Sequence, residues 1–258
     1  MLRITNPTLA SVAILLFMCL APEVASGQGR FVGDGQTLDV VPYGFPESRG
    51  AVATGGGLVL SGTVTNVPAG GDHAQLFGVQ VGAQQLGERG VLEPPSDGLA
   101  RAFGTTVALV AGRVVVADPE AALGFVQGRI DSWAAGLLPQ GERRTLLPPE
   151  PDCALFGSVL ESDGARLAVL SRAQGSIAVR GFVYGPDASG GGWVLEDRLA
   201  VQEEVGDLAV FGERLAFEGS RLALGAPWRR GGSGGVFVFV ESPTTGAWQQ
   251  EAELVVPG

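Results

Sequence analysis

The feature that most constrains the fold of this chain is an internal repeat. The dipeptide Phe-Gly recurs at Phe103-Gly104, Phe156-Gly157 and Phe211-Gly212. The intervals between copies are 53 and 55 residues, and each copy is followed by two short apolar runs separated by a turn that contains Gly. Runs bounded in this way are typical of β-hairpins. Their recurrence at a nearly fixed interval indicates a chain built from similar structural units.

Each predicted hairpin is followed by a second pair of apolar runs, so each unit holds about four strands. The predicted strands are 50–54, 58–62, 74–81 and 87–92; 106–110, 113–119, 124–130 and 144–147; 158–162, 165–170, 180–184 and 193–199; 214–218, 220–227, 236–240 and 248–256. The runs are almost continuously apolar, which is typical of strands covered on both faces. We therefore expect an all-β fold, a β-propeller of about four four-stranded antiparallel blades.

The chain is predicted to hold one domain, residues 28–258, with repeats near 45–98, 99–150, 151–205 and 206–258. A further predicted strand at 37–41 either closes the ring beside the last strand or is the remnant of a fifth blade. Residues 1–27 are typical of a secretory signal peptide, because Arg3 precedes an apolar run at 9–21 and small residues precede the predicted cut before Gln28. We expect the mature chain to be exported, with no membrane span.

The charge of the chain argues against nucleic acid as a partner. The formal net charge is −10 and every basic residue except one His is Arg, because the chain has no lysine. An acidic chain without a basic stripe is a poor ligand for nucleic acid or for anionic membranes. Cys153 is the only cysteine after the predicted leader, and its apolar neighbours favour a buried, unreactive thiol over one available to a partner.

The fourth repeat resembles a known family. Phe211-Gly212 opens its first hairpin and Gly225-Ala226-Pro227 ends it, and Trp248 follows the run Gly-Val-Phe-Val-Phe. These features resemble the FG-GAP repeat, which builds the β-propeller of integrin α-subunits and of many secreted bacterial proteins. The resemblance extends over most of residues 45–258 and is weaker in the earlier repeats. It implies an exported propeller that acts by binding other molecules.

Two departures from the integrin type affect what we expect. That type usually has seven repeats and this chain has four, so either four blades close a ring or an open arc is completed by another chain. Integrin-type repeats also often carry an Asp-x-Asp-x-Asp-Gly loop that binds calcium. The corresponding turns here are short, and only Asp163 supplies a carboxylate. We expect no metal and no cofactor.

The sequence contains no convincing catalytic set. His73 is the only histidine, so neither a Ser–His–Asp arrangement nor a zinc site is well supplied. The acidic pairs Glu196-Asp197 and Glu203-Glu204 are adjacent along predicted strands, and adjacent residues of a strand point to opposite faces. The expected function is therefore non-catalytic binding. An enzyme on a propeller scaffold, such as a glycan-active hydrolase or lyase, is the alternative.

One end of the predicted disc is the better candidate for a site. The loops between the second and third strands of each blade gather there with the blade-to-blade loops, and loops on a rigid scaffold often bind ligands. Trp228, Arg229 and Arg230 stand out because Trp and Arg are typical of binding hot spots; Asp118 and Arg172 are predicted at the same face. The expected partner is an extracellular protein or glycan of unknown identity, and self-association is a further alternative.

Overall fold

The computed structural model describes the side chains of Leu60 and Gly62 and of residues 91–123, 128–135, 141–174, 179–189, 191–199, 214–227 and 233–255. It also describes the backbone of six strands at residues 29–33, 36–40, 52–55, 58–63, 73–79 and 86–92. The predicted leader, Phe211-Gly212 and the tripeptide Trp228-Arg229-Arg230 lie outside the described residues. Within the described part of the chain, no helix is long and apolar enough to cross a membrane.

Sixteen of the strands form four antiparallel sheets, each of four strands in chain order. The first sheet is β3 (Val52–Gly55), β4 (Leu58–Thr63), β5 (His73–Val79) and β6 (Leu86–Leu92). The second is β7 (Thr106–Val110), β8 (Arg113–Leu123), β9 (Val126–Ala134) and β10 (Arg144–Leu146). The third is β11 (Cys153–Ser162), β12 (Leu167–Ala173), β13 (Val179–Pro186) and β14 (Trp193–Leu199). The fourth is β15 (Leu215–Glu218), β16 (Arg221–Ala226), β17 (Gly235–Glu241) and β18 (Trp248–Leu254). These sheets confirm the four predicted blades.

The predicted strand at 37–41 does not extend the fourth sheet. It corresponds to β2 (Gln36–Val40), which pairs with β1 (Gly29–Gly33) in a separate two-stranded sheet. Among the strands described, β18 pairs only with β17. The expectation that residues 37–41 close a ring beside the last strand is therefore corrected. The hydrogen-bonding partner of this segment is the neighbouring strand β1 instead.

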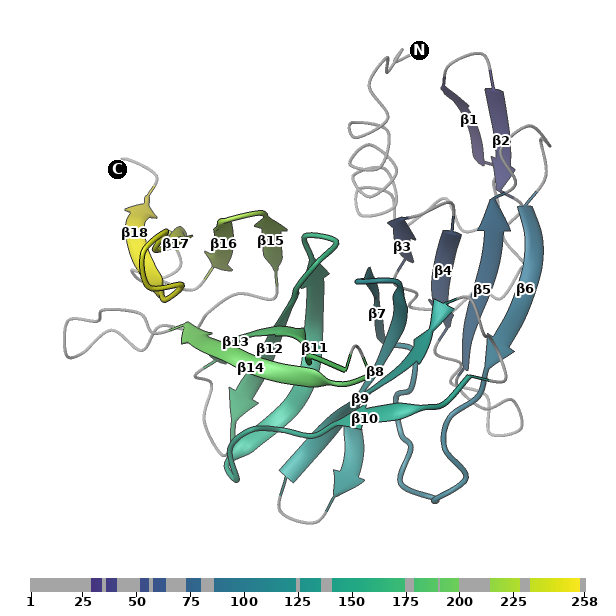
Figure 1. Ribbon diagram of the computed structural model, residues 1–258, viewed down its shortest axis with the longest axis horizontal. Coiled ribbons are helices and arrows are strands. Elements are labelled where there is room, and N and C mark those ends of the chain that lie inside the picture. Colours follow the sequence, from purple (N-terminus) through teal and green to yellow (C-terminus); the bar gives the residue numbers. More distant parts are fainter. Residues whose placement is uncertain are drawn as a thin grey trace.

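The four sheets follow one another along an arc (Figure 1). Their first strands, β3, β7, β11 and β15, border its inner side. Each sheet packs on the next: β3 and β4 on β7, β7 to β9 on β11, β11 on β15 and β14 on β18. Among the described strands, no comparable packing joins the first sheet to the fourth. The arc is therefore open between its two ends.

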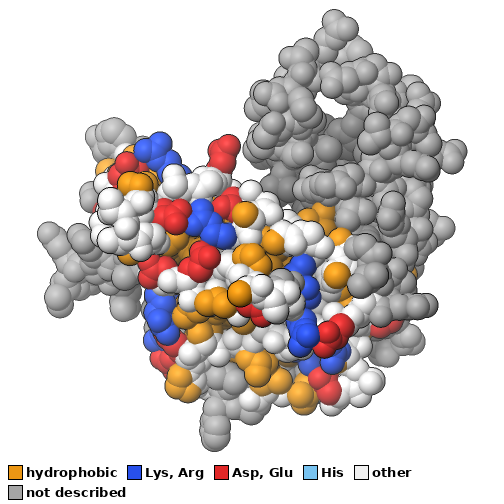
Figure 2. Space-filling view, viewed as in Figure 1, with side chains coloured by type: hydrophobic (Ala, Val, Ile, Leu, Met, Phe, Trp, Pro, Cys, Tyr) orange, Lys and Arg blue, Asp and Glu red, His pale blue; other side chains and the backbone are white. Residues whose placement is uncertain are grey.

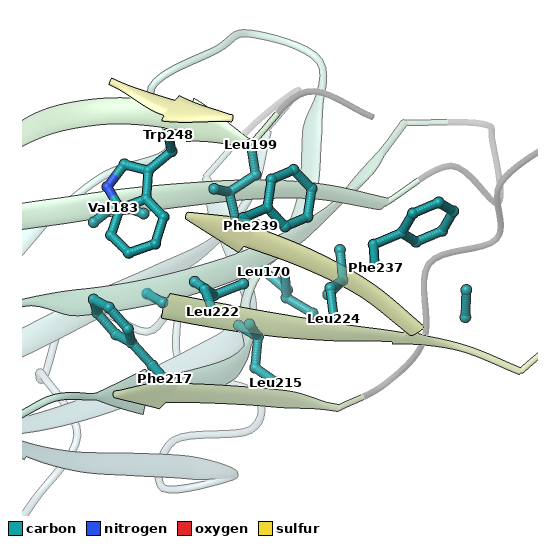
Figure 3. Close-up of a cluster of buried hydrophobic side chains, with 12 residues drawn as sticks. Leu170, Val183, Leu199, Leu215, Phe217, Leu222, Leu224, Phe237, Phe239 and Trp248 are labelled. Atoms are coloured by element: carbon teal, nitrogen blue, oxygen red, sulfur yellow. The ribbon is translucent and has the colours of Figure 1, made fainter. Parts of the chain in front are cut away.

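The core consists of three hydrophobic clusters, one at each seam between successive sheets. Alternate residues of a strand point to opposite faces, so each inner sheet supplies side chains to two seams. In the seam between the third and fourth sheets, Leu170, Val183 and Leu199 meet Leu224, Phe237 and Phe239 (Figure 3). This arrangement explains why the strands are apolar along nearly their whole length.

The Phe-Gly motif lies where two sheets come closest. Phe103 and Phe156 are fully buried. Gly104 and Gly157 have φ angles of 91° and 88°, a left-handed region that favours glycine. A Cβ atom at Gly157 would lie 2.8 Å from the Cβ of Ala117 in the second sheet. The motif therefore combines a buried aromatic anchor with a left-handed glycine, and at Gly157 the side chains of Ala117 and Ile130 in the second sheet leave no room for a further side chain.

Candidate functional site

The fourth sheet carries an open depression where β16 ends and β17 begins. It has a volume of about 580 Å³. Its lining consists of Arg214, Gly225, Ala226, Pro227, Ser233, Gly234, Gly235, Val236, Leu254 and Val255. Leu254 is 57% exposed and Val255 is 38% exposed, which is unusual for large apolar side chains at the end of a strand.

The local backbone explains why this surface is hollow. Four of the lining residues are Gly or Ala, so the floor of the depression is largely main chain. The turn into β17 passes through Gly234 at a φ of 79°, and the Gly225 amide donates a hydrogen bond of 3.1 Å to the Arg214 carbonyl. Such a surface can accept an apolar or aromatic group.

The strongest sequence candidates, Trp228, Arg229 and Arg230, lie outside the described residues. The described residues on either side of their segment, Pro227 and Ser233, both line the depression. The segment therefore begins and ends at this part of the fourth sheet.

Arg172 lies at the corresponding place in the third sheet. It is exposed near the end of β12, two residues after Leu170, just as Pro227 comes two residues after Gly225. The register supports this equivalence, because Leu170 pairs with Gly181 and Gly225 pairs with Val236 at matching positions of the two sheets. Arg172 and the depression therefore lie at the same end of neighbouring sheets.

Asp118 occupies a different position from the one predicted. The sequence suggested an exposed loop at residues 118–123, but β8 continues to Leu123 through a register shift between Asp118 and Ala122. Asp118 is fully buried, and its carboxylate accepts hydrogen bonds from the amides of Arg101 and Ala102 at 3.2 and 2.9 Å. The placement of Asp118 at an exposed binding face is therefore corrected.

A buried ion network surrounds Asp118. The Arg129 side chain lies 2.5 Å from Asp97, 3.5 Å from Asp131 and 3.7 Å from Asp118. Burial raises the pKa of both Asp118 and Asp131 above the ordinary value, and nearby hydrogen-bond donors and Arg129 act against this rise. In contrast, the Leu99 amide and Arg129 lower the pKa of Asp97. The network fastens residues 97–102 to the second sheet, so its role is structural.

The remaining polar candidates are also used within the fold. Asp163 accepts hydrogen bonds from the amides of Ala165 and Arg166 at 2.9 and 2.6 Å, and so closes its own turn. Asp197 accepts a 2.6 Å hydrogen bond from the Trp248 amide across the seam to the fourth sheet. Within the described ranges, no group of three or more His, Cys, Asp or Glu residues is arranged to hold a metal ion.

Cys153 is buried and makes no disulfide, so the prediction of a buried thiol is confirmed. The pair Glu203-Glu204 lies outside the described residues. On the face seen in Figure 2, arginines lie beside acidic side chains and form no continuous basic surface. Several arginines form ion pairs with carboxylates, such as Arg198 with Glu150 at 2.8 Å and Arg180 with Asp152 at 2.5 Å.

Comparison with known proteins establishes the fold and nothing finer. No protein-family model and no curated protein matches the chain. Among solved structures, prolyl oligopeptidase B from Galerina marginata is 11% identical with a TM-score of 0.53; the match covers 87% of this chain and 29% of that one. The Saccharomyces cerevisiae protein Sqt1 is 13% identical with a TM-score of 0.47, covering 80% of this chain and 47% of that one.

The part of the peptidase that matches is a β-propeller-type fold, which together with the four four-stranded sheets confirms the predicted fold class. The chain spans about half the length of Sqt1 and less than a third of the peptidase. At this level of identity, similarity concerns architecture alone, because one fold supports many unrelated activities.

Proposed function

We propose that this chain is an exported, non-catalytic interaction module of the FG-GAP type, which binds an extracellular protein or glycan at the open end of its fourth blade. One observation carries the proposal. The residues that flank Trp228-Arg229-Arg230 line an apolar depression built largely from main chain. Trp and Arg are the residue types enriched in binding hot spots, and the sequence places Trp228, Arg229 and Arg230 between two residues that line the depression.

The other polar residues that were candidates for chemistry support a binding role indirectly. Asp118, Asp163 and Asp197 are each engaged by backbone amides, and Arg129 is enclosed by carboxylates. A catalytic carboxyl must face its substrate in a cleft, within hydrogen-bonding reach of the group it acts on. Asp118, Asp163 and Asp197 instead hold a loop, a turn and a seam in place.

The family and the location rest on sequence. In two Phe-Gly motifs the Phe is buried and the Gly has a left-handed conformation. The motif on which the FG-GAP resemblance depends therefore has a structural role where neighbouring sheets meet. The leader at residues 1–27 supports export. Purification of the mature chain from the medium or cell surface, followed by N-terminal sequencing that begins at Gln28, tests this part.

The binding site is tested with mature protein, residues 28–258. Fluorescently labelled protein is applied to a printed glycan array and to a panel of purified extracellular-matrix proteins, and any probe that binds is titrated. The double variant Trp228→Ala/Arg229→Ala should weaken binding by about tenfold or more, as expected for hot-spot residues. The control Arg144→Ala removes an exposed arginine of the second sheet, paired with Glu142, and should leave affinity unchanged. Equal affinities of the double variant and the wild type would rule out this site.

A further inference from the structure

The fourth sheet has an outer face, directed away from the third sheet, that is apolar. Two neighbouring rows of the register on this face hold Ala216, Ala223, Gly225, Val236, Val238, Ala252 and Leu254, and the row beside them holds Glu218, Arg221, Val240 and Gln249. The side chains that alternate with them, such as Leu222 and Phe237, are buried in the seam with the third sheet. A sheet with one face in water normally alternates apolar and polar residues. The two inner strands of this sheet, β16 and β17, have the pattern of strands covered on both faces.

The same positions of the third sheet form an established interface. A register shift follows Val183 in that sheet and Val238 in the fourth, which aligns the two sheets residue by residue. Under this alignment, Ala168 corresponds to Ala223 and Leu199 to Leu254. The third-sheet residues are buried against the fourth sheet. The outer face of the fourth sheet is therefore equivalent to the surface with which one blade packs on the next.

An arginine accompanies this surface at the same position in the third and fourth sheets. Arg166 precedes Ala168 by two residues and reaches across the seam, where its guanidinium lies 5.3 Å from the Trp248 ring centroid and 5.5 Å from that of Phe217. It also pairs with Glu241 at 2.8 Å and donates a 2.6 Å hydrogen bond to the Gly219 carbonyl. These contacts leave its side chain only 17% exposed.

Arg221 holds the same position in the fourth sheet, two residues before Ala223. Its side chain is 67% exposed and pairs at 3.3 Å with Glu251 of its own sheet. An arginine that stacks on aromatic rings gains more when it is desolvated than when it is exposed. The fourth sheet thus presents the apolar rows and the guanidinium that a following blade would bury.

The first sheet is the matching end of the arc. In the third and fourth sheets, Tyr184 and Phe239 come directly after the register shift and pack in the seam with the preceding sheet. In the first sheet, Phe77 occupies this register position, while Thr54 and Leu86 stand where the fourth sheet has Phe217 and Trp248. Among the described strands, no four-stranded sheet precedes the first one. Among the described strands, the arc therefore has the outer face of the fourth sheet at one end and, at the other, a sheet with the register of a recipient.

We propose that the outer face of the fourth sheet packs on the first sheet of a second copy of this chain, so that two chains close one ring of eight blades. Among the described strands of one chain, no substantial packing joins the first sheet to the fourth. A two-fold axis joins both pairs of ends at once and leaves no apolar sheet face in water. Eight blades lie within the range that propellers adopt. Gly225, Val236 and Leu254 belong both to this face and to the depression of the proposed ligand site, so the second copy and a ligand would compete for them.

The test is the mass of mature protein, residues 28–258, measured by light scattering after size exclusion over a range of concentrations. The expected mass is twice that of one chain. Val238→Glu places a charge in the centre of the outer face and should give a monomer with an unchanged circular dichroism spectrum. The matched control is Val194→Glu, because Val194 is 51% exposed on β14, away from the outer face, and this variant should remain a dimer.

Arg221→Glu is a second variant that does not alter the apolar rows, and it should weaken the dimer by about tenfold or more. Trp228→Ala/Arg229→Ala should leave the mass unchanged, which separates this proposal from the proposed ligand site. A wild-type monomer at all concentrations would overturn the proposal. So would a series of larger open assemblies, or a dimer that withstands both Val238→Glu and Arg221→Glu.

Discussion

Glu161 provides a sharp test of how the seam between the third and fourth sheets is built. It pairs in register with Ala168 and therefore lies on the face of the third sheet that packs on the fourth. Among the described residues, no hydrogen bond or ion pair reaches its carboxylate. Burial raises the pKa of Glu161 from 4.5 to about 7. The perturbation is Glu161→Gln, which keeps the size of the side chain and removes its charge.

The sign of the effect follows from the direction of the shift. A carboxyl group whose pKa is higher in the folded protein than in the unfolded chain favours folding when it is protonated. Its ionised form therefore costs stability as pH rises from about 4.5 to 7, and the cost is constant above pH 7. A change from 4.5 to about 7 corresponds to about 3 kcal/mol. Because the side chain is only partly buried, we expect about 1–3 kcal/mol.

The assay is urea unfolding of the wild type, Glu161→Gln and the control Glu218→Gln at pH 4, 6 and 8. Glu218 is an exposed strand glutamate of the fourth sheet, so its replacement should change the free energy of unfolding little. Glu161→Gln should match the wild type at pH 4 and exceed it by about 1–3 kcal/mol at pH 8. An equal gain at both pH values, or none at pH 8, would refute the reasoning.

Two further substitutions test the backbone contact and the ion network. Gly128→Ala should destabilise the fold by about 3 kcal/mol or more, because the new Cβ would lie 2.5 Å from the backbone N and O of Phe156. The control Gly112→Ala has a similar positive φ but no atom within 4 Å of the new Cβ, so it should cost about 1 kcal/mol. Equal urea midpoints for the two variants would contradict this prediction. Asp118→Ala should cost about 3–5 kcal/mol in the same assay, since it leaves Arg129 buried with fewer carboxylates. A loss below about 1 kcal/mol would show that Asp118 is not part of the fastening.

Local sequence signals predicted the blades well because the apolar runs and the Gly turns are local. The predicted strand at 193–199 coincides with β14, and that at 106–110 with β7. The start of β11 was missed, because Phe156-Gly157 was taken to precede the strand. In the structure it lies inside β11, at a register shift next to Leu155 with its φ of 52°. A bulge of this kind depends on the neighbouring sheet, which a local pattern does not record.

The candidate site also combines features that the local sequence predicts with features that only the folded sheets determine. The segment at 228–230 was predicted from composition, but the depression beside it combines the ends of three strands with Arg214, and only the folded sheet brings these together. Asp118 was misplaced because the sequence Ala-Asp-Pro is typical of a strand end. Its partner Arg129 lies opposite it on the next strand, a pairing that depends on register rather than on spacing.

An arginine lies at the start of the second strand of a blade or directly before it, and this repetition has a consequence for how the number of blades could change. Arg113, Arg166 and Arg221 occupy this position in three successive sheets. Each seam takes its contacts from fixed positions of two adjacent units, so a gene duplication of one whole unit would copy both halves of a seam together. Blade number could then change by insertion or loss of complete repeats, while every surviving junction keeps the chemistry it already has.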